Sequence, residues 1–296
     1  MIIPTYLKKG DKIGIVATAR KISEAELAPA LRIIEEKGLI PVLGKNLLRG
    51  YHQFSGTDAE RCEDLQNMLD DDSIKAIIVA RGGYGTVRII DSVDFTKFKQ
   101  HPKWIVGYSD ITVLHSHIHN MLSIATLHAT MPINFLHDTY ATETLFKALF
   151  GEKIFYEFEA HPLNRKGSVK GQVVGGNLSL LYALNGSVSD LNTDGTILFI
   201  EDLDEYLYHI DRMMMNLKRS GKLAHLKALI VGGMSDMKDN TIPYGKTAEE
   251  IIAEHVAEFN YPVCFGFPAG HIKNNYALKL GADGKLCIDE VCSFEQ

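Results

Sequence analysis

The chain has 296 residues, a length that fits two domains of ordinary size or one large α/β domain. Its 46% hydrophobic and 23% charged residues are typical of a globular protein and exclude a disordered or fibrous one. A formal net charge of −6 argues against nucleic acid as the main partner, because phosphate binding needs a basic face. The sequence has no apolar run of membrane-span length and no stretch typical of a signal peptide. We therefore expect a cytoplasmic protein without a membrane partner.

The first half of the chain alternates between strand and helix patterns. Short apolar runs predict strands at 12–17, 74–79 and 104–106. The run at 39–42 predicts an edge strand, because Pro41 cannot donate a hydrogen bond within a sheet. The pairs Ser23 with Glu26 and Thr57 with Glu60 have the spacing of capping boxes, and a helical apolar pattern follows each of them. This alternation with short connections predicts a parallel sheet that is covered by helices on both faces.

The second half of the chain differs in pattern from the first. Between about residues 151 and 171 the sequence becomes mixed and polar, so we predict a linker between domains at 1–150 and 172–296. The second domain shows strand patterns at 196–200, 228–231 and 263–267 and a helix near 205–220. The end of the chain resembles a β-hairpin that pairs 277–280 with 285–288. We expect an α/β domain with more antiparallel character than the first.

The stretch Gly107-Tyr-Ser-Asp110 lies between a predicted strand and a predicted helix. A serine on such a sharp turn would project its hydroxyl from the carboxyl edge of the sheet, as in a nucleophile elbow. The usual G-x-S-x-G motif lacks its second glycine here, so Ser109 or Asp110 could instead only cap the helix.

The stretch Arg81-Gly-Gly-Tyr-Gly85 follows another central strand. Adjacent glycines let the backbone come close to a ligand, and their N–H groups could receive an oxyanion or a phosphate. The stretch matches neither G-x-G-x-x-G nor the P-loop, so a plain tight turn stays an open alternative.

Acidic and histidine side chains follow strands in the second half. Four carboxylates lie in Glu201-Asp-Leu-Asp-Glu205, where they could hold Mg²⁺, orient a histidine or only begin a helix. His271 follows a predicted strand and a run of turn residues, a position where catalytic groups often lie. His115 and His119 are four residues apart but lack a third ligand, so we interpret them as structural or surface residues.

Ser109, Glu201 and His271 occur in the chain order of hydrolases whose acid precedes the histidine. Each residue comes just after a predicted strand. A catalytic triad could therefore assemble across the boundary between the domains.

The sequence resembles the LD-carboxypeptidase family of serine peptidases from about Lys8 to the C-terminus. The resemblance rests on five blocks in this order: Ala80-Arg-Gly-Gly-Tyr-Gly85, Gly107-Tyr-Ser-Asp110, Gly175-Gly-Asn-Leu178, Ile200-Glu-Asp202 and Gly266-Phe-Pro-Ala-Gly-His271. It implies a Rossmann-like N-terminal domain and a smaller β-rich α/β C-terminal domain, with the site in the groove between them.

The resemblance also implies roles for particular residues. Ser109 would be the nucleophile, His271 the general base and Glu201 its orienting carboxylate. The backbone N–H groups of Asp110 and Gly83 would form the oxyanion hole. Family members are typically cytoplasmic homodimers that act on murein tetrapeptides during cell-wall recycling.

We therefore predict a serine carboxypeptidase that releases the terminal D-alanine from a murein tetrapeptide and needs neither a metal nor an organic cofactor. Arg81 is a candidate for binding the substrate's carboxylate, although it could instead only brace its loop through backbone carbonyls. Asn177 is a second substrate-binding candidate.

Other functions stay open at this point. A sister branch of the family cleaves peptidyl-nucleotide antibiotics of the microcin C type, but the chain shows no long insertion after Glu201, which favours the murein branch. In a metal-dependent phosphoryl-transfer enzyme, Glu201, Asp202 and Asp204 would hold Mg²⁺. A murein-binding protein without turnover is the third alternative.

Overall fold

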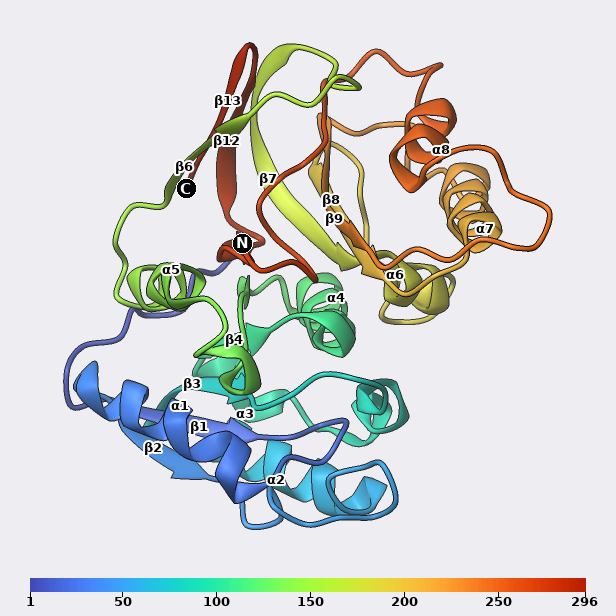
Figure 1. Ribbon diagram of the computed structural model, residues 1–296. Coiled ribbons are helices and arrows are strands. Elements are labelled where there is room, and N and C mark those ends of the chain that lie inside the picture. Colours follow the sequence, from blue (N-terminus) through green and yellow to red (C-terminus); the bar gives the residue numbers. More distant parts are fainter.

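The computed structural model describes residues 1–296 as two α/β domains, each built around its own β-sheet (Figure 1). The first part of the chain contains β1 (Lys12–Val16), α1 (Glu24–Glu36), β2 (Ile40–Leu43), α2 (Asp58–Asp70), β3 (Ile74–Val79), η1 (Thr86–Arg88), η2 (Ile90–Ser92), α3 (Thr96–Gln100), β4 (Trp104–Gly107), η3 (Ser109–Ile111), α4 (Thr112–Leu122), β5 (Thr126–His128), η4 (Pro132–Asn134) and α5 (Thr139–Leu149). The second part contains β6 (Phe155–Glu159), β7 (Gly167–Asn177), α6 (Leu178–Leu184), β8 (Ile197–Leu203), α7 (Leu207–Arg219), β9 (Ala228–Ser235), α8 (Ala248–His255), β10 (Val263–Cys264), β11 (Leu278–Leu280), β12 (Asp283–Ile288) and β13 (Val291–Glu295). No helix combines the length and apolarity that a membrane crossing requires.

The first sheet confirms the predicted parallel arrangement. Its strand order is β11-β5-β4-β3-β1-β2, and every pair from β2 to β5 is parallel. Helix α1 packs on the face that carries Ile13 and Ile15, while α2 packs on the opposite face with Ile77 and Val79. Both helices begin at the predicted capping boxes, because Ser23 and Thr57 each accept a hydrogen bond from the N–H three residues later.

The second sheet is mixed, which confirms the antiparallel character expected for this part of the chain. Its order is β10-β9-β8-β7-β12-β13-β6. Strands β7 to β10 are parallel, whereas β7, β12, β13 and β6 pair antiparallel. The 11-residue strand β7 joins the two halves of the sheet.

The structure differs from the sequence-based expectations at two segments. The expected linker at 151–171 contains β6, which pairs with β13, and the first residues of β7. The predicted hairpin of 277–280 with 285–288 is wrong, because β12 pairs with β13 and β7 while β11 joins the first sheet beside β5. The short apolar run of β11 fits either sheet edge, so its partner depends on tertiary packing.

The two domains meet where the carboxyl ends of β7 and β8 face α4. A Cβ on Gly176 would lie 2.5 Å from Oγ1 of Thr112, the first residue of α4, so only a glycine permits this approach. A Cβ on Gly175 would lie 1.9 Å from the carbonyl oxygen of Phe199 in β8. Because ligands bind at the carboxyl ends of parallel strands, this junction is the natural place for a site.

We expect Gly175→Ala to lower the free energy of unfolding by at least about 2 kcal/mol more than Gly186→Ala, since a rigid backbone carbonyl cannot move away from the new methyl group. Gly186 is the matched control, because it also has a positive φ, of 83°, but its Cβ would meet nothing within 4 Å. Urea unfolding of both variants checks this. Equal losses of stability would contradict the predicted steric conflict.

Candidate active site

Ser109 lies at a strained turn between β4 and α4. Its φ is +64°, a left-handed conformation that residues other than glycine rarely adopt. The serine begins η3 directly after Tyr108, so the chain turns sharply from the strand into the helix. Strain of this kind is typical of nucleophile elbows and clusters at functional sites.

The glycine turn after β3 packs against this serine. A Cβ on Gly82 would lie 3.0 Å from Cβ and 3.2 Å from Oγ of Ser109. The Asp110 carboxylate fixes the same loop, because its Oδ2 accepts a hydrogen bond of 2.8 Å from the N–H of Thr86. Burial raises the pKa of the Asp110 carboxyl. The structure thus brings together two of the stretches singled out from the sequence.

Glu201 and His271 form a directly bonded pair. Glu201 lies in β8 and its side chain is completely buried. Its Oε2 accepts a hydrogen bond of 2.6 Å from His271 Nδ1 and another of 3.0 Å from the His271 backbone N–H. Gly270 lets the chain pass against the carboxylate, because a Cβ there would lie 2.7 Å from the Glu201 Cβ.

The pair shifts the pKa of both members. Burial opposes the charged form of each group, but their mutual attraction and hydrogen bond outweigh it. The pKa of Glu201 is therefore lowered and the pKa of His271 is raised. With Nδ1 donating to the carboxylate, Nε2 of a neutral His271 is the nitrogen that can accept a proton.

The Tyr108 ring, next to Ser109 in the chain, packs against the His271 ring. The ring centroids of Tyr108 and His271 are 4.8 Å apart, and the Tyr108 hydroxyl accepts a hydrogen bond of 2.6 Å from Asn134 Nδ2. Ser109 and His271 share no hydrogen bond in this structure. Such bonds are often long in ligand-free enzymes and tighten when substrate binds. The sequence offered no signal for Asn134, whereas Tyr108 lies inside the Gly107–Asp110 motif.

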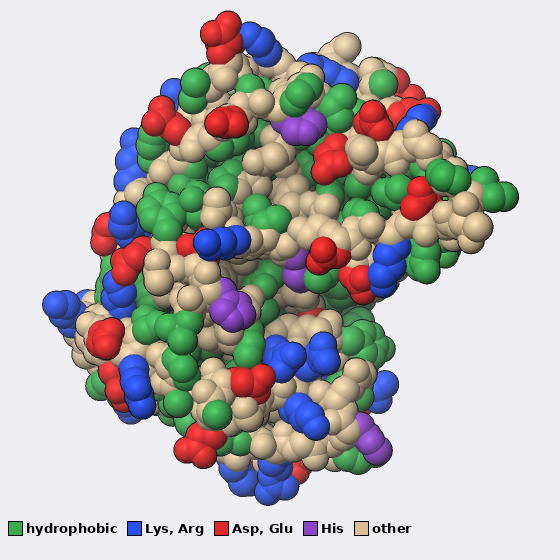
Figure 2. Space-filling view, in the orientation of Figure 1, with side chains coloured by type: hydrophobic (Ala, Val, Ile, Leu, Met, Phe, Trp, Pro, Cys, Tyr) green, Lys and Arg blue, Asp and Glu red, His purple; other side chains and the backbone are tan.

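A pocket of about 480 Å³ opens beside this pair. Its walls come from both domains and consist of Tyr108, Thr130, Asn134, His137, Asp138, Leu203, His271, Ile272, Lys273 and Asn275. Figure 2 shows the surface hollowed between the two domains, with histidine in and beside the hollow and basic side chains on the N-terminal domain below it. The volume fits a small molecule or a short peptide.

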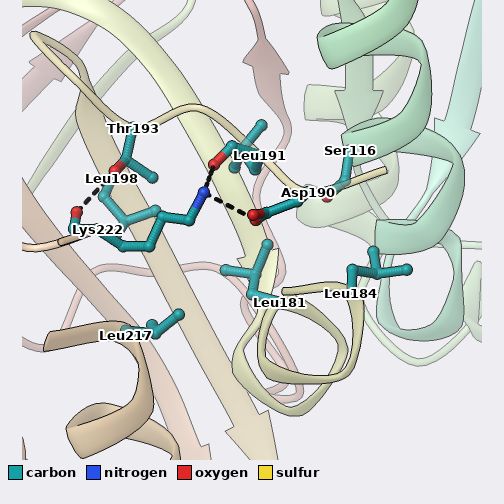
Figure 3. Close-up of a pocket in the computed structure, with 9 residues that line it drawn as sticks. All are labelled: Ser116, Leu181, Leu184, Asp190, Leu191, Thr193, Leu198, Leu217 and Lys222. Carbon is teal, nitrogen blue, oxygen red and sulfur yellow. Dashed lines mark hydrogen bonds and ion pairs between the residues drawn. The ribbon is translucent and has the colours of Figure 1, made fainter. Parts of the chain in front are cut away.

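A second pocket lies between α4, α6 and α7 and is too small to bind a peptide (Figure 3). Its volume of about 10 Å³ is roughly what one water molecule needs. Lys222 Nζ closes it by contacting Asp190 at 2.8 Å and the Leu191 carbonyl at 2.7 Å. This ion pair fastens the loop after α6 to the segment after α7, so its role is structural.

Asn177 connects the two domains, and its predicted role in substrate binding stays a prediction. The residue is buried, and its backbone N–H donates a hydrogen bond of 3.0 Å to Thr112 Oγ1. Its Nδ2 donates to Asp202 Oδ1 at 2.9 Å, while its Oδ1 accepts from the N–H of Leu180 and caps α6. The polar atoms of Asn177 therefore have partners inside the protein, and the geometry does not support a contact with substrate.

Arg81 is also paired within the protein. Its Nη1 lies 3.4 Å from the Lys21 carbonyl oxygen and 3.4 Å from Oε1 of Glu26. This geometry favours the second of the two interpretations, in which Arg81 braces its loop.

The acidic run does not form a cation site. Glu201 bonds to His271, Asp202 to Asn177, and Asp204 pairs with Lys238 at 2.7 Å. No group of three or more acidic, histidine or cysteine side chains is arranged to hold a metal ion. Of the paired histidines, His115 is buried and donates from Nε2 to the Gly107 carbonyl at 2.9 Å, which supports its structural interpretation.

We expect Thr112→Val to lower the free energy of unfolding by about 1–3 kcal/mol, because it leaves the buried N–H of Asn177 without an acceptor. The amide hydrogen of Asn177 should also exchange faster with solvent, which nuclear magnetic resonance can follow. Thr241→Val is the control, since Thr241 is exposed and its side chain makes no hydrogen bond, so its stability should stay within about 0.5 kcal/mol. Unchanged exchange at Asn177 would show that this bond does not couple the domains.

Comparison with known proteins identifies the family to which this chain is similar. Residues 13–129 match the LD-carboxypeptidase N-terminal domain, and residues 170–286 match the LD-carboxypeptidase C-terminal domain. The probable murein peptide carboxypeptidase of Bacillus subtilis is 38% identical over 289 residues, which are 96% of this chain and 91% of that protein. The murein tetrapeptide carboxypeptidase of Pseudomonas aeruginosa is 29% identical and covers 95% of each chain.

Solved structures show the same fold. The muramoyltetrapeptide carboxypeptidase of Oxalobacter formigenes superposes with a TM-score of 0.88 at 24% identity, covering 96% of this chain and 98% of that one. MccF in complex with glutamyl sulfamoyl guanosine also gives a TM-score of 0.88, at 21% identity, covering 100% of this chain and 99% of that one. From the two matched domains and the relatives in which nearly its whole length aligns, it follows that this chain belongs to the LD-carboxypeptidase family.

Proposed function

We propose that this protein is a serine carboxypeptidase that hydrolyses the L,D-peptide bond before the terminal D-alanine of murein tetrapeptides. The observation that carries the proposal is the bonded pair of Glu201 and His271 beside the strained turn of Ser109. Similar proteins named for murein peptides support the substrate class. The resemblance to the family also supports a cytoplasmic homodimer.

In the proposed mechanism, Ser109 Oγ attacks the carbonyl carbon of the scissile bond while His271 Nε2 takes the hydroxyl proton. His271 then gives this proton to the nitrogen of the leaving D-alanine, and an acyl-enzyme ester remains on Ser109. Water, deprotonated by the same Nε2, hydrolyses the ester and restores the serine. Glu201 holds the tautomer with Nδ1–H and stabilises the imidazolium formed in each half of the reaction.

The oxyanion of the tetrahedral intermediate would be bound by the backbone N–H groups of Gly83 and Asp110. Neither N–H donates a hydrogen bond within the protein, so both are free for a substrate oxygen. The contact between Gly82 and Ser109 brings the two turns together. Donors of this kind are most effective when they are fixed before the reaction, and the bond from Asp110 to Thr86 supplies that rigidity.

We also propose the division into a nucleophile domain at 1–150 and a domain at 172–296 that carries the acid and the base. Strand β11 belongs to the second range of residues but pairs with β5 in the first sheet. Glu201 and His271 come from one side of this division and Ser109 from the other.

Cleavage of a peptidyl nucleotide is the second candidate, because MccF shares the fold. The connection after β8 is short, since β8 ends at Leu203 and α7 begins at Leu207. It leaves no long insertion over the pocket to enclose a nucleotide, which favours the murein peptide. Parallel assays with both substrates separate the two functions.

We expect Ser109→Ala to reduce the turnover of murein tetrapeptide by several powers of ten while the variant still binds it, because the hydroxyl acts in the chemical steps. Mass spectrometry of the tripeptide product measures turnover, and calorimetry measures binding. Ser168→Ala, which changes an exposed serine of β7, should keep wild-type activity. Near-wild-type turnover by folded Ser109→Ala would refute the assigned nucleophile.

The rate should depend on pH through His271. The base must be neutral to take the serine proton, and its pKa is raised, so kcat/KM should fall as the pH drops through that raised value. In Glu201→Gln the attraction is lost while burial still disfavours the cation, so the acid limb should move to lower pH and the maximal rate should fall.

Glu205→Gln is the matched control for this pH experiment. Glu205 Oε2 also accepts a hydrogen bond of 2.6 Å from a histidine Nδ1, that of His209, but this pair lies on α7 and its preceding loop. The control should keep the wild-type profile. An acid limb that stays in place in Glu201→Gln would show that the titrating group is not His271.

A further inference from the structure

Arg20 lies across the glycine turn beside the nucleophile. A Cβ on Gly83 would lie 2.3 Å from both Cγ and Cδ of Arg20, so the bare glycine backbone provides the surface on which the arginine stem rests. Arg20 is exposed, and its guanidinium makes no hydrogen bond or ion pair in the structure. An arginine without an ion-pair partner therefore packs its stem on Gly83, one of the two residues of the proposed oxyanion hole.

The other arginines around this turn are all paired with carboxylates. Arg61 and Arg88 both contact Asp58, and Arg81 contacts Glu26. Arg61 is buried under the turn and also donates to the Gly85 carbonyl at 3.1 Å. These arginines hold the loop in place, and only Arg20 keeps its five N–H donors available.

The backbone of Arg20 is fixed on both sides. Its N–H donates to the Gly82 carbonyl at 3.4 Å, and the residue forms an isolated β-bridge with Phe54. The next residue, Lys21, donates to the Gln53 carbonyl at 3.0 Å. Because the backbone and the stem are held, a ligand would need to order only the end of the side chain, which lowers the entropic cost of binding.

The position suits the carboxylate of a C-terminal residue. Gly82 contacts Ser109 and the adjacent Gly83 contacts the stem of Arg20, so the proposed nucleophile and the arginine pack on neighbouring residues of one turn. In a peptide that loses its last residue, only the nitrogen and one Cα separate the scissile carbonyl from the terminal carboxylate. The carbonyl carbon and the carboxylate carbon are therefore only about 3–4 Å apart by standard bond lengths, so the group that binds the carboxylate must lie close to the nucleophile.

We propose that Arg20 binds the terminal carboxylate of the substrate and so makes the enzyme an exopeptidase. This inference rests on the proposed carboxypeptidase function. The planar guanidinium can donate two parallel hydrogen bonds to a carboxylate, which fixes the direction of the last residue as well as its charge. A substrate without that charge would lose this contact and keep the others.

The test compares kcat/KM for murein tetrapeptide with kcat/KM for the same peptide amidated at its C-terminus. In Arg20→Gln the acid-to-amide ratio should fall about 10-fold or more, because the acid loses a contact that the amide does not make. Arg20→Lys keeps the charge and the stem over Gly83 but cannot donate two parallel hydrogen bonds to a carboxylate, so its acid-to-amide ratio should be intermediate. Lys21→Gln removes a neighbouring exposed cation and should keep the wild-type ratio.

Three other outcomes would contradict the proposed role of Arg20. An unchanged ratio in Arg20→Gln and Arg20→Lys overturns the role of Arg20. A fall of the ratio in Lys273→Gln alone also overturns it, since Lys273 is a cation that lines the pocket. If the wild-type protein cleaves neither peptide, the proposed function itself fails and the role of Arg20 fails with it.

Discussion

The burial of the Glu201 carboxylate is the constraint on which the arrangement of the site depends. An unpaired charge without solvent costs several kcal/mol, and here it is compensated by two N–H groups of one residue, His271. This requirement holds the loop after Gly270 against β8 and fixes the imidazole ring. The same charge raises the pKa of His271, the base of the proposed mechanism.

A second constraint is the hydrogen-bonded connection between the domains. Thr112 follows the Ser109 turn, Asn177 ends β7, and Asp202 lies next to Glu201. The hydrogen bonds from Asn177 to Thr112 and to Asp202 therefore fix the position of Ser109 relative to Glu201 and His271. Burial and the neighbouring Glu201 charge raise the pKa of Asp202 to about 7. Because Ser109 follows a strand of the first sheet and Glu201 lies in the second, the proposed reaction would depend on this alignment.

Features that depend on neighbouring residues in the chain could be predicted from the sequence, whereas features that depend on contacts between the domains could not. Capping boxes, buried parallel strands and the strained serine turn all follow from short-range patterns such as those at Ser23 and Ser109. The placement of β11 and the inward role of Asn177 depend on contacts across the domain boundary, which sequence spacing does not reveal. Arg20 has no motif of its own, because its significance comes from resting on Gly83.

The proposed activity is tested most directly by measuring hydrolysis of the last peptide bond in two diastereomeric tetrapeptides. Wild-type protein is incubated with a murein tetrapeptide ending in D-alanine and, separately, with the same peptide ending in L-alanine, and both products are quantified by mass spectrometry. We expect equal amounts of tripeptide and D-alanine from the first substrate and little reaction with the second. Cleavage at another bond, or no release of D-alanine at any enzyme concentration, would contradict the proposed activity.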